Sequence, residues 1–142
     1  MKVADSNLIN EIEDIYILQS GIFYFCSDYV ISEINEGINF NWELAQEVIE
    51  LVISHYGPDV EISYISNRVN SYSLVPQDWL KFFSARHSMR CFGIVTYSEA
   101  GLMNVMMEKL FFKSKMKKFK TLYKATDWVK ENAPVLFRKL SS

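Results

Sequence analysis

Blocks of hydrophobic and polar residues follow one another along this chain and predict a regular order of strands and helices. Two β-rich runs separated by Ser27 and Asp28 predict a hairpin over residues 22–35. Apolar residues then recur at helical spacing over 41–56, and Gly57-Pro58 ends that helix. Residues 61–66 alternate between polar and apolar side chains, which is typical of a half-buried strand.

The second half of the chain continues the alternation of helix and strand. A helix beginning at Pro76 leads to a nearly continuous apolar run at 91–95, as expected for a buried parallel strand. A helix over 99–112, a short strand over 116–121 and a helix over 124–132 complete the order, and Pro134 ends the last helix. We predict an α/β domain with a mixed, mostly parallel sheet of about five strands. The hairpin supplies its one antiparallel pairing, and helices cover both faces.

The beginning of the chain is interpreted separately. Residues 1–21 form a lead-in segment, and residues 22–142 form the domain itself. Leu8, Ile9 and Ile12 fit helical spacing, which favours a helical lead-in. A short strand at 15–18 is the alternative.

Length, charge and cysteine content narrow the class of protein. A chain of 142 residues is long enough for one domain with its own core. The net charge of −2 argues against a general polyanion binder, so nucleic acid is not an expected partner. Cys26 and Cys91 lie in apolar runs, which favours buried thiols in a reducing compartment. We find no apolar segment typical of a signal peptide or membrane span, so we expect a cytoplasmic protein.

The order of elements, together with Ala125, Trp128 and Val129 in the last helix, resembles the STAS-like superfamily. This SpoIIAA-like group includes the anti-sigma factor antagonists and is related to the CRAL-TRIO-like lipid-binding proteins. The segment Met116-Lys117-Lys118-Phe119 before that helix is similar to the ending common in the group. The resemblance covers residues 22–133 in outline and implies a SpoIIAA-like α/β fold.

The resemblance also implies a place for a regulatory serine. In the antagonists, a phosphorylatable serine opens the helix after the third strand, in an Asp-Ser-Ser-Gly context. Ser71 and Ser73 lie near the corresponding place here, but the acidic residue and the glycine are missing. Phosphorylation is therefore the less favoured hypothesis for this loop.

The densest cluster of uncharged polar residues follows the strand predicted at 61–66. In open parallel sheets, ligands bind at the carboxyl ends of the strands. An anion or a polar peptide group could bind here, and the candidate site residues are Asn67, Arg68, Asn70, Ser71 and Ser73. The alternative is that these side chains bond the loop's own backbone.

No set of residues predicts catalysis. His55 and His87 are the two histidines, and both come at helix ends that should lie away from the carboxyl edge of the sheet. The sequence has no glycine-rich phosphate loop, no cysteine spacing typical of metal ligands and no paired carboxylates. We therefore predict a protein that is not an enzyme and that holds no cofactor and no metal.

Lysines are concentrated towards the end of the chain. Such a run could bind nucleic acid or an anionic membrane surface. The favoured interpretation is an edge strand that lysine protects against aggregation. The run consists of Lys109, Lys113, Lys115, Lys117, Lys118, Lys120 and Lys124.

The helix predicted at 99–112 is apolar almost all round, which is more than a single sheet face can cover. We predict that a second copy covers the remainder, because large apolar patches are seldom left bare and methionine suits an interface. The homodimer would form through Leu102, Met103, Met106 and Met107. Packing of the N-terminal segment on this helix, through Leu8, Ile9 and Ile12, is the alternative.

Together these patterns predict a non-catalytic regulatory or protein-interaction domain with an unknown protein partner. The alternative is a small-molecule or lipid-binding domain, which the resemblance to CRAL-TRIO-like proteins permits. An apolar cavity would distinguish the two functions, because only the second needs one. Trp79 and Trp128 are expected to be core anchors, not ligand platforms.

Overall fold

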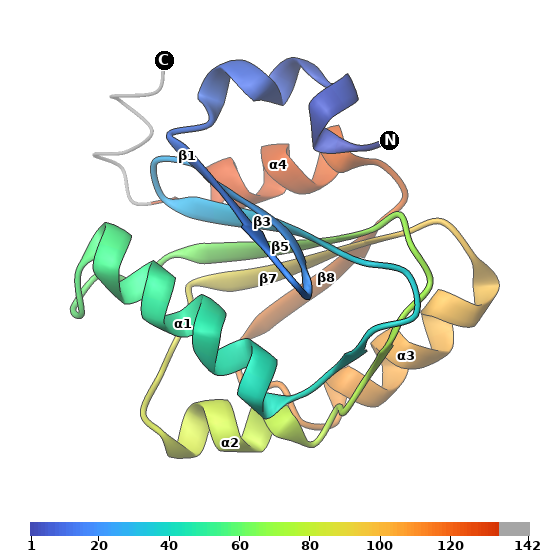
Figure 1. Ribbon diagram of the computed structural model, residues 1–142. Coiled ribbons are helices and arrows are strands. Elements are labelled where there is room, and N and C mark those ends of the chain that lie inside the picture. The colour runs from blue at the N-terminus through green and yellow to red at the C-terminus, as the bar shows by residue number, and fades with distance from the viewer. Residues whose placement is uncertain (134–142) are drawn as a thin grey trace.

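The computed structural model describes residues 1–133, and its centre is a six-stranded mixed sheet (Figure 1). The strands lie in the order β1 (Asp14–Leu18), β2 (Gly21–Phe25), β3 (Tyr29–Ile34), β5 (Ser63–Arg68), β7 (Cys91–Thr96) and β8 (Lys115–Phe119). The first three strands pair antiparallel, and β3, β5, β7 and β8 pair parallel. A second, two-stranded sheet of β4 (Asn39–Phe40) and β6 (Ser73–Leu74) follows the carboxyl ends of β3 and β5.

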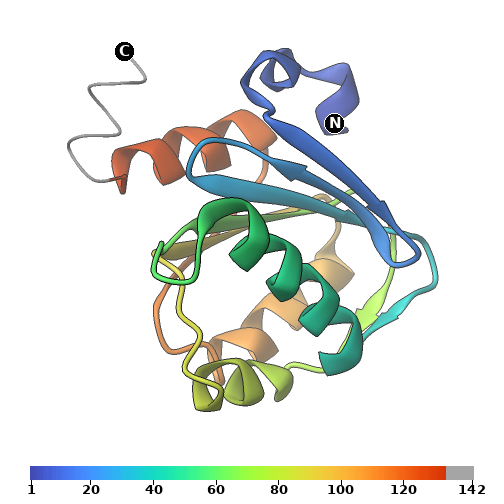
Figure 2. The same ribbon diagram turned by 60° about the vertical axis from the view of Figure 1, so that its left-hand side comes forward.

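Helices cover both faces of the large sheet, as the sequence predicted (Figures 1 and 2). One face carries α1 (Trp42–Tyr56), α2 (Asp78–Ser84) and α3 (Glu99–Lys109). The opposite face carries α4 (Leu122–Glu131) and the two short 3-10 helices η1 (Val3–Asp5) and η2 (Asn7–Glu11). The chain therefore forms a three-layered α/β fold, which confirms the predicted class with one strand more than expected.

Local capping explains where the longer helices begin and end. The Asn41 side chain accepts a hydrogen bond from the Leu44 amide at 3.0 Å, so α1 begins at the next residue. Gly57 ends α1 with a φ of 98°, a left-handed conformation that glycine adopts without steric cost. Ser98 and Thr121 cap α3 and α4 in the same way as Asn41 caps α1. These positions lie within a residue or two of the boundaries that the sequence predicted, and the predicted stop at Pro134 lies outside the described residues.

The N-terminal segment differs from its prediction. Residues 15–18 belong to the strand β1, and the helical turns before it are of the 3-10 type. The reason is the alternation of β1: Ile15 and Ile17 point to solvent, while Tyr16 packs edge-on against Phe25 with ring centroids 4.8 Å apart. The sheet therefore has two antiparallel pairings, β1 with β2 and β2 with β3, not the single hairpin pairing that we predicted.

Both predicted tryptophan anchors pack against the core. Trp79 lies between Phe82, Phe92 and Phe112, with ring centroids 4.8 to 5.5 Å apart. Trp128 packs on Phe119 on the opposite face of the sheet. Each indole stays half-buried, so these residues close the edge of the core instead of filling its centre.

Candidate functional site

The predicted site lies at the carboxyl end of β5, and its first two residues, Asn67 and Arg68, belong to that strand instead of to the loop after it. The Asn67 amide nitrogen donates to Glu33 Oε2 at 2.8 Å and to the Met1 carbonyl at 2.9 Å. The Asn67 amide oxygen accepts from the Tyr97 hydroxyl at 2.7 Å. Asn67 is buried, and its hydrogen-bonding groups tie β5 to β3 and to the N-terminus.

The remaining uncharged residues of the loop bond to a neighbouring segment of the same chain. The Asn70 amide donates to the Ile34 carbonyl at 2.9 Å, and the Ser73 hydroxyl donates to the Asn39 side chain at 3.0 Å. The Ser71 backbone N–H donates to Glu36 Oε2 at 2.6 Å. These contacts hold β6 beside β4, and they go to the segment around β4 instead of to the loop's own backbone, which was the alternative expected from the sequence. A binding role for these residues stays a prediction.

Arg68 is different, because its partner comes from α3. Arg68 Nη2 lies 2.6 Å from Glu108 Oε2 in an ion pair whose side chains are only 8% and 2% exposed. The Trp79 indole N–H donates to Glu108 Oε1 at 3.1 Å, and Arg68 Nε donates to Ser66 Oγ at 3.1 Å. Burial alone would lower the pKa of Arg68, but Tyr72 and Glu108 raise this pKa above its ordinary value, so the guanidinium stays charged.

The geometry of this pair is closer to a pure charge contact than to a well-aligned hydrogen bond. Glu108 Oε2 has no hydrogen bond of good geometry, and Arg68 Nη1 has no hydrogen-bond partner within residues 1–133. The pair is neutral as a whole and shielded from water. Its clearest consequence is structural, because it fixes which side of α3 faces the sheet.

An apolar cavity of about 310 Å³ lies between α1, α2 and the sheet. Its walls are largely apolar side chains, among them Phe23, Val48, Ile49, Val52, Tyr64 and Phe82. Charged groups also line it, from Asp59, Glu61 and Arg86, together with His87. Nothing in the sequence pattern predicted this space, because it depends on how far α1 and α2 stand from the sheet.

A smaller cavity of about 80 Å³ adjoins the first one and reaches the buried ion pair. The two share Ala45 and Trp79 among their lining residues, and the smaller one also contacts Arg68 and Glu108. The smaller cavity therefore lies near the carboxyl end of β5, whereas the larger one extends to the segment before β5 and to the residues after α2. Ligand pockets in proteins typically begin at about 300 Å³, so the larger cavity is at the lower limit for a small molecule.

The outer side of α3 is apolar and open to solvent. Met103 is 66% exposed, Met106 65% and Leu110 72%, and Met107 is also exposed. We call these four residues the methionine stripe. Within α3 only Val105 and Glu108 are buried, so the helix turns its one interior carboxylate inward and its methionines outward.

The N-terminal segment does not cover the methionine stripe, which corrects the alternative packing considered above. η1 and η2 lie on the opposite face of the sheet, beside α4 (Figure 1). The Asn7 backbone N–H donates to the Tyr123 hydroxyl at 2.9 Å, and Lys130 Nζ lies 2.6 Å from Glu11 Oε1. The stripe therefore stays uncovered by residues 1–133 of this chain, and the predicted homodimer stays a prediction.

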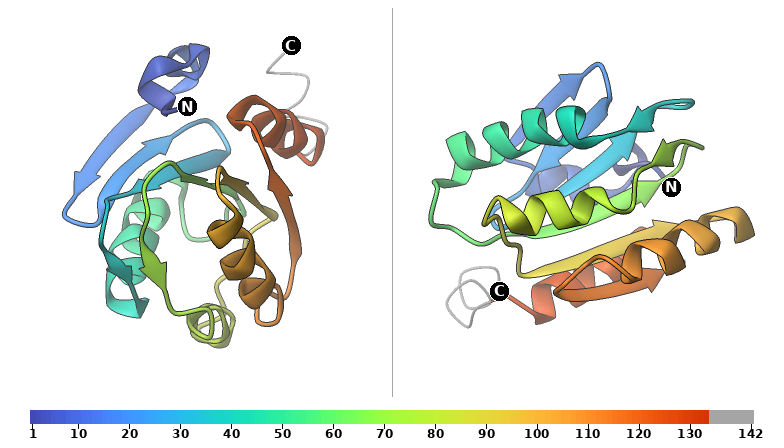
Figure 3. Two further views of the ribbon diagram at one scale, coloured as in Figure 1. Left: turned by 90° about the vertical axis from the view of Figure 1, so that its right-hand side faces the viewer. Right: turned by 90° about the horizontal axis from the view of Figure 1, so that it is seen from below.

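The middle of the lysine run lies on β8, the edge strand next to α3 (Figure 3), whereas Lys109 ends α3 and Lys124 lies in α4. β8 pairs with β7 and forms one edge of the sheet, as the lysine-rich pattern indicated. Lys118 stands opposite Ile94, which packs on the α3 face, whereas Lys117 stands opposite Gly93 on the α4 face. The lysines are thus divided between the two faces.

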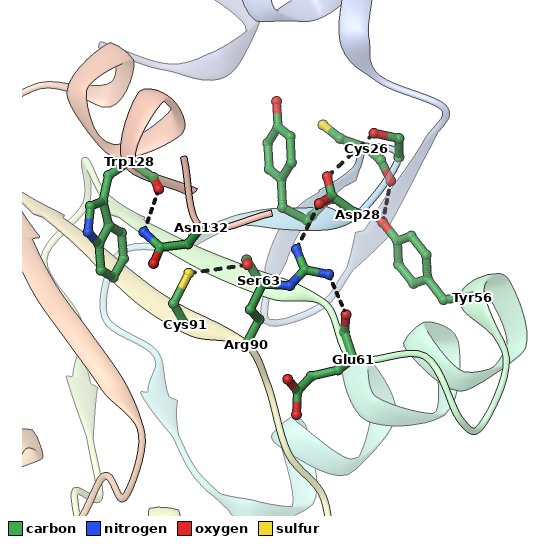
Figure 4. A network of polar contacts seen from close by, with 11 residues as sticks. Cys26, Asp28, Tyr56, Glu61, Ser63, Arg90, Cys91, Trp128 and Asn132 are labelled. Carbon is green, nitrogen blue, oxygen red and sulfur yellow. Dashed lines mark hydrogen bonds and ion pairs between the residues drawn. The ribbon is translucent and has the colours of Figure 1, made fainter. Parts of the chain in front are cut away.

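A separate polar network lies at the amino ends of the parallel strands β3, β5 and β7 (Figure 4). Arg90 donates to Asp28 Oδ2 and to the Glu61 carbonyl, both at 2.8 Å. The Tyr56 hydroxyl donates to the Cys26 carbonyl. These bonds join the turn after β2, the segment before β5 and the end of α1, so their role is to hold strand ends together.

The cysteines and histidines fit the structural interpretation. Cys26 and Cys91 are both buried and free, and the Cys91 thiol donates to Ser63 Oγ at 3.2 Å. His55 pairs with Glu13 at 3.0 Å near the end of α1, and His87 follows α2 beside Phe82. Neither histidine lies in the loop at the carboxyl end of β5.

Residues 1–133 bring together no group of three or more His, Cys, Asp or Glu side chains suited to a metal ion. No helix in the same range has the length and hydrophobicity needed to cross a membrane.

Comparison with known proteins identifies the fold. The sequence matches no protein-family model and no curated protein. The structure is similar to that of an uncharacterized protein of the DUF3478 family from Shewanella loihica PV-4, which has a SpoIIAA-like fold. The two are 16% identical, the match covers 82% of this chain and 90% of that chain, and the TM-score is 0.54. The chain therefore has a SpoIIAA-like fold, which confirms at the level of structure the resemblance noted from the sequence.

Proposed function

We propose that this protein is a non-catalytic interaction domain that binds another protein through α3. The observation that carries the proposal is the methionine stripe, a run of large apolar side chains exposed at i, i+3, i+4 and i+7 on one helix. A surface helix in a complete structure normally shows polar residues on that side. An exposed stripe of this length marks an interaction surface.

Two further features support an interaction role. Methionine is flexible and polarisable, and it is common on surfaces that adapt to a partner. The polar side chains at the carboxyl end of β5, where a catalytic set would be sought, bond to side chains and a backbone carbonyl of neighbouring elements. The regulatory role implied by the fold's likeness to STAS-like proteins is an analogy that fits both features.

Site-specific photo-crosslinking tests the proposal. A photoreactive amino acid at Met106 should give a discrete crosslinked protein in the cells that make this chain. The same group at Glu47, an exposed position on α1, is the matched control. Substituting Met103→Gln and Met107→Gln should abolish the Met106 product. Equal crosslinking at both positions, or no product at Met106, would contradict an interaction through α3.

The cavity supports a second candidate function, the binding of a small apolar molecule. Its volume of about 310 Å³ and its apolar walls meet the condition that distinguishes a ligand-binding domain from a pure interaction domain. Ala45 faces both cavities, so Ala45→Phe should fill the space between them. Native mass spectrometry of freshly purified protein should then show a retained ligand in the original chain and none in the variant. A bare mass for both, with unchanged melting temperatures on addition of apolar fragments, would argue against this function.

A further inference from the structure

The charge around α3 is unusual for an acidic protein. Residues 109–120 contain six lysines and no aspartate or glutamate, although the net charge of the chain is −2. This segment is therefore opposite in charge to the rest of the chain. A concentration of one charge raises the local concentration of molecules of the other charge and speeds their association.

Part of this charge lies on the same side of the sheet as the methionine stripe. Lys109 ends α3, and Lys113 lies in the short turn between α3 and β8. Lys118 points to the α3 face, because its partner in the register is Ile94, which packs in the same cluster as Val105. Figure 3 shows α3 beside β8, so the helix that carries the exposed methionines and the strand that carries the exposed Lys118 are neighbours on this face.

The spacing of the stripe indicates the shape of what covers it. Side chains at i, i+3, i+4 and i+7 form a helical ridge, and such ridges pack into the grooves of another helix. An added strand on the free edge of β8 would instead leave the stripe uncovered. A helix with one apolar face and acidic flanks would cover the methionine stripe and pair its carboxylates with the lysines.

We infer that the partner contributes an acidic amphipathic helix, which lies along the methionine stripe and places carboxylates against Lys109, Lys113 and Lys118. This inference rests on the proposed interaction through α3 and adds the chemistry of the partner. A second copy of the same surface fits less well, because it brings six more lysines and offers Glu99 as the one exposed acidic residue of α3, since Glu108 is buried. Exposed charge pairs contribute little individually, so the charges act mainly on specificity and association rate.

The test uses two capped helical peptides of about 18 residues, a length at which helix formation becomes measurable in water. Both carry leucine at i, i+3 and i+4 spacing. One has glutamate at the flanking positions, and the other has lysine at the same positions. Fluorescence anisotropy of the labelled peptides measures the dissociation constant with the full-length protein. We expect the acidic peptide to bind at least tenfold more tightly than the basic one, and this preference to shrink as salt is raised.

Matched variants distinguish the contribution of the lysines from that of the methionine stripe. Lys113→Gln with Lys118→Gln should weaken binding of the acidic peptide about tenfold and leave the basic peptide unchanged or improved. Lys117→Gln with Lys124→Gln removes the same charge from the opposite face and should have little effect. Met103→Gln with Met107→Gln should weaken both peptides.

The outcomes are distinct. Equal binding of the two peptides, lost in the methionine variant, would overturn the acidic assignment and leave the interaction through α3 standing. Absence of binding by either peptide would overturn both. Co-sedimentation with phosphatidylserine vesicles in preference to the acidic peptide would assign the surface to a membrane and overturn the inference. Self-association that blocks both peptides would assign the stripe to a second copy.

Discussion

Removing the carboxylate of Glu108 should destabilise this protein more than removing any exposed charge. In the structure Glu108 Oε2 lies 2.6 Å from Arg68 Nη2, and the two side chains are 2% and 8% exposed. Glu108→Gln would leave the Arg68 guanidinium buried without a counter-charge. Glu108→Ala would in addition remove the acceptor of the Trp79 indole N–H.

The expected magnitude follows from burial and distance. Opposite unit charges about 4 Å apart interact by about 4 kcal/mol at the effective dielectric constant of about 20 that suits protein sites. Breaking buried pairs by removing one partner costs about 3–5 kcal/mol. We therefore expect Glu108→Gln to lower the free energy of unfolding by about 3 kcal/mol. An unpaired indole N–H adds about 1 kcal/mol or more in Glu108→Ala.

A double variant distinguishes charge pairing from simple loss of packing. Arg68→Met with Glu108→Gln removes both charges and keeps an acceptor for Trp79. Buried pairs replaced together are often neutral in stability, so this variant should recover most of the loss seen in Glu108→Gln. Urea denaturation followed by far-UV circular dichroism gives all the values on one scale. A loss below about 1 kcal/mol for Glu108→Gln, or a double variant no more stable than the single one, would refute the reasoning.

Three other predictions test separate parts of the structure. Trp79→Ala should cost about 3–5 kcal/mol in the same denaturation assay, because the indole contacts three phenylalanine rings and Glu108, and an unchanged midpoint would exclude it as a core anchor. Burial raises the pKa of Cys26 to about 12 and also raises that of Cys91, so at pH 8 both stay protonated thiols; neither should react with iodoacetamide until urea is added, and rapid native labelling would contradict their burial. Because an acidic helix of another protein fits the methionine stripe better than a second copy does, sedimentation velocity at micromolar concentration should show a monomer, and a dimer that Met106→Lys dissociates would assign the stripe to self-association.

Features set by neighbouring residues were the ones that the sequence predicted well. The limits of α1 depend on Asn41 and Gly57, which act on the backbone within one helical turn of themselves. The strand β7 could be predicted because a short apolar run bounded by polar residues is typical of a buried parallel strand. The STAS-like order of elements follows from such local signals, so it could be stated without a structure.

The N-terminal segment shows the opposite case. Leu8, Ile9 and Ile12 fit a helix, while residues 15–18 fit either a helix or a strand. What decides for a strand is the unpaired edge of β2, to which β1 adds five residues in register. This edge is close in the sequence, because β2 begins three residues after β1 ends, but the pattern of residues 15–18 alone does not show that they pair with it.

The candidate loop was located correctly in the fold, but the surroundings of its residues could not be predicted. Asn67 and Arg68 are consecutive residues whose partners come from different elements, Glu33 on β3 and Glu108 on α3. Asn70 and Ser73 bond to the segment around β4, whose pairing with β6 has no strong sequence pattern. Polar residues in a loop reveal hydrogen-bonding capacity, and only the fold shows where that capacity is used.

The orientation of α3 links the buried ion pair to the exposed stripe. A rotation of α3 that placed the methionines against the sheet would bury more apolar surface than the observed orientation does. Turning the helix in that way would expose Glu108 and leave Arg68 buried without its counter-charge, at a cost of several kcal/mol. The ion pair therefore holds α3 in the orientation that presents Met103, Met106 and Leu110 outward. On this argument, separating Arg68 from Glu108 should do more than lower stability: it should also loosen α3 and weaken whatever binds along the stripe.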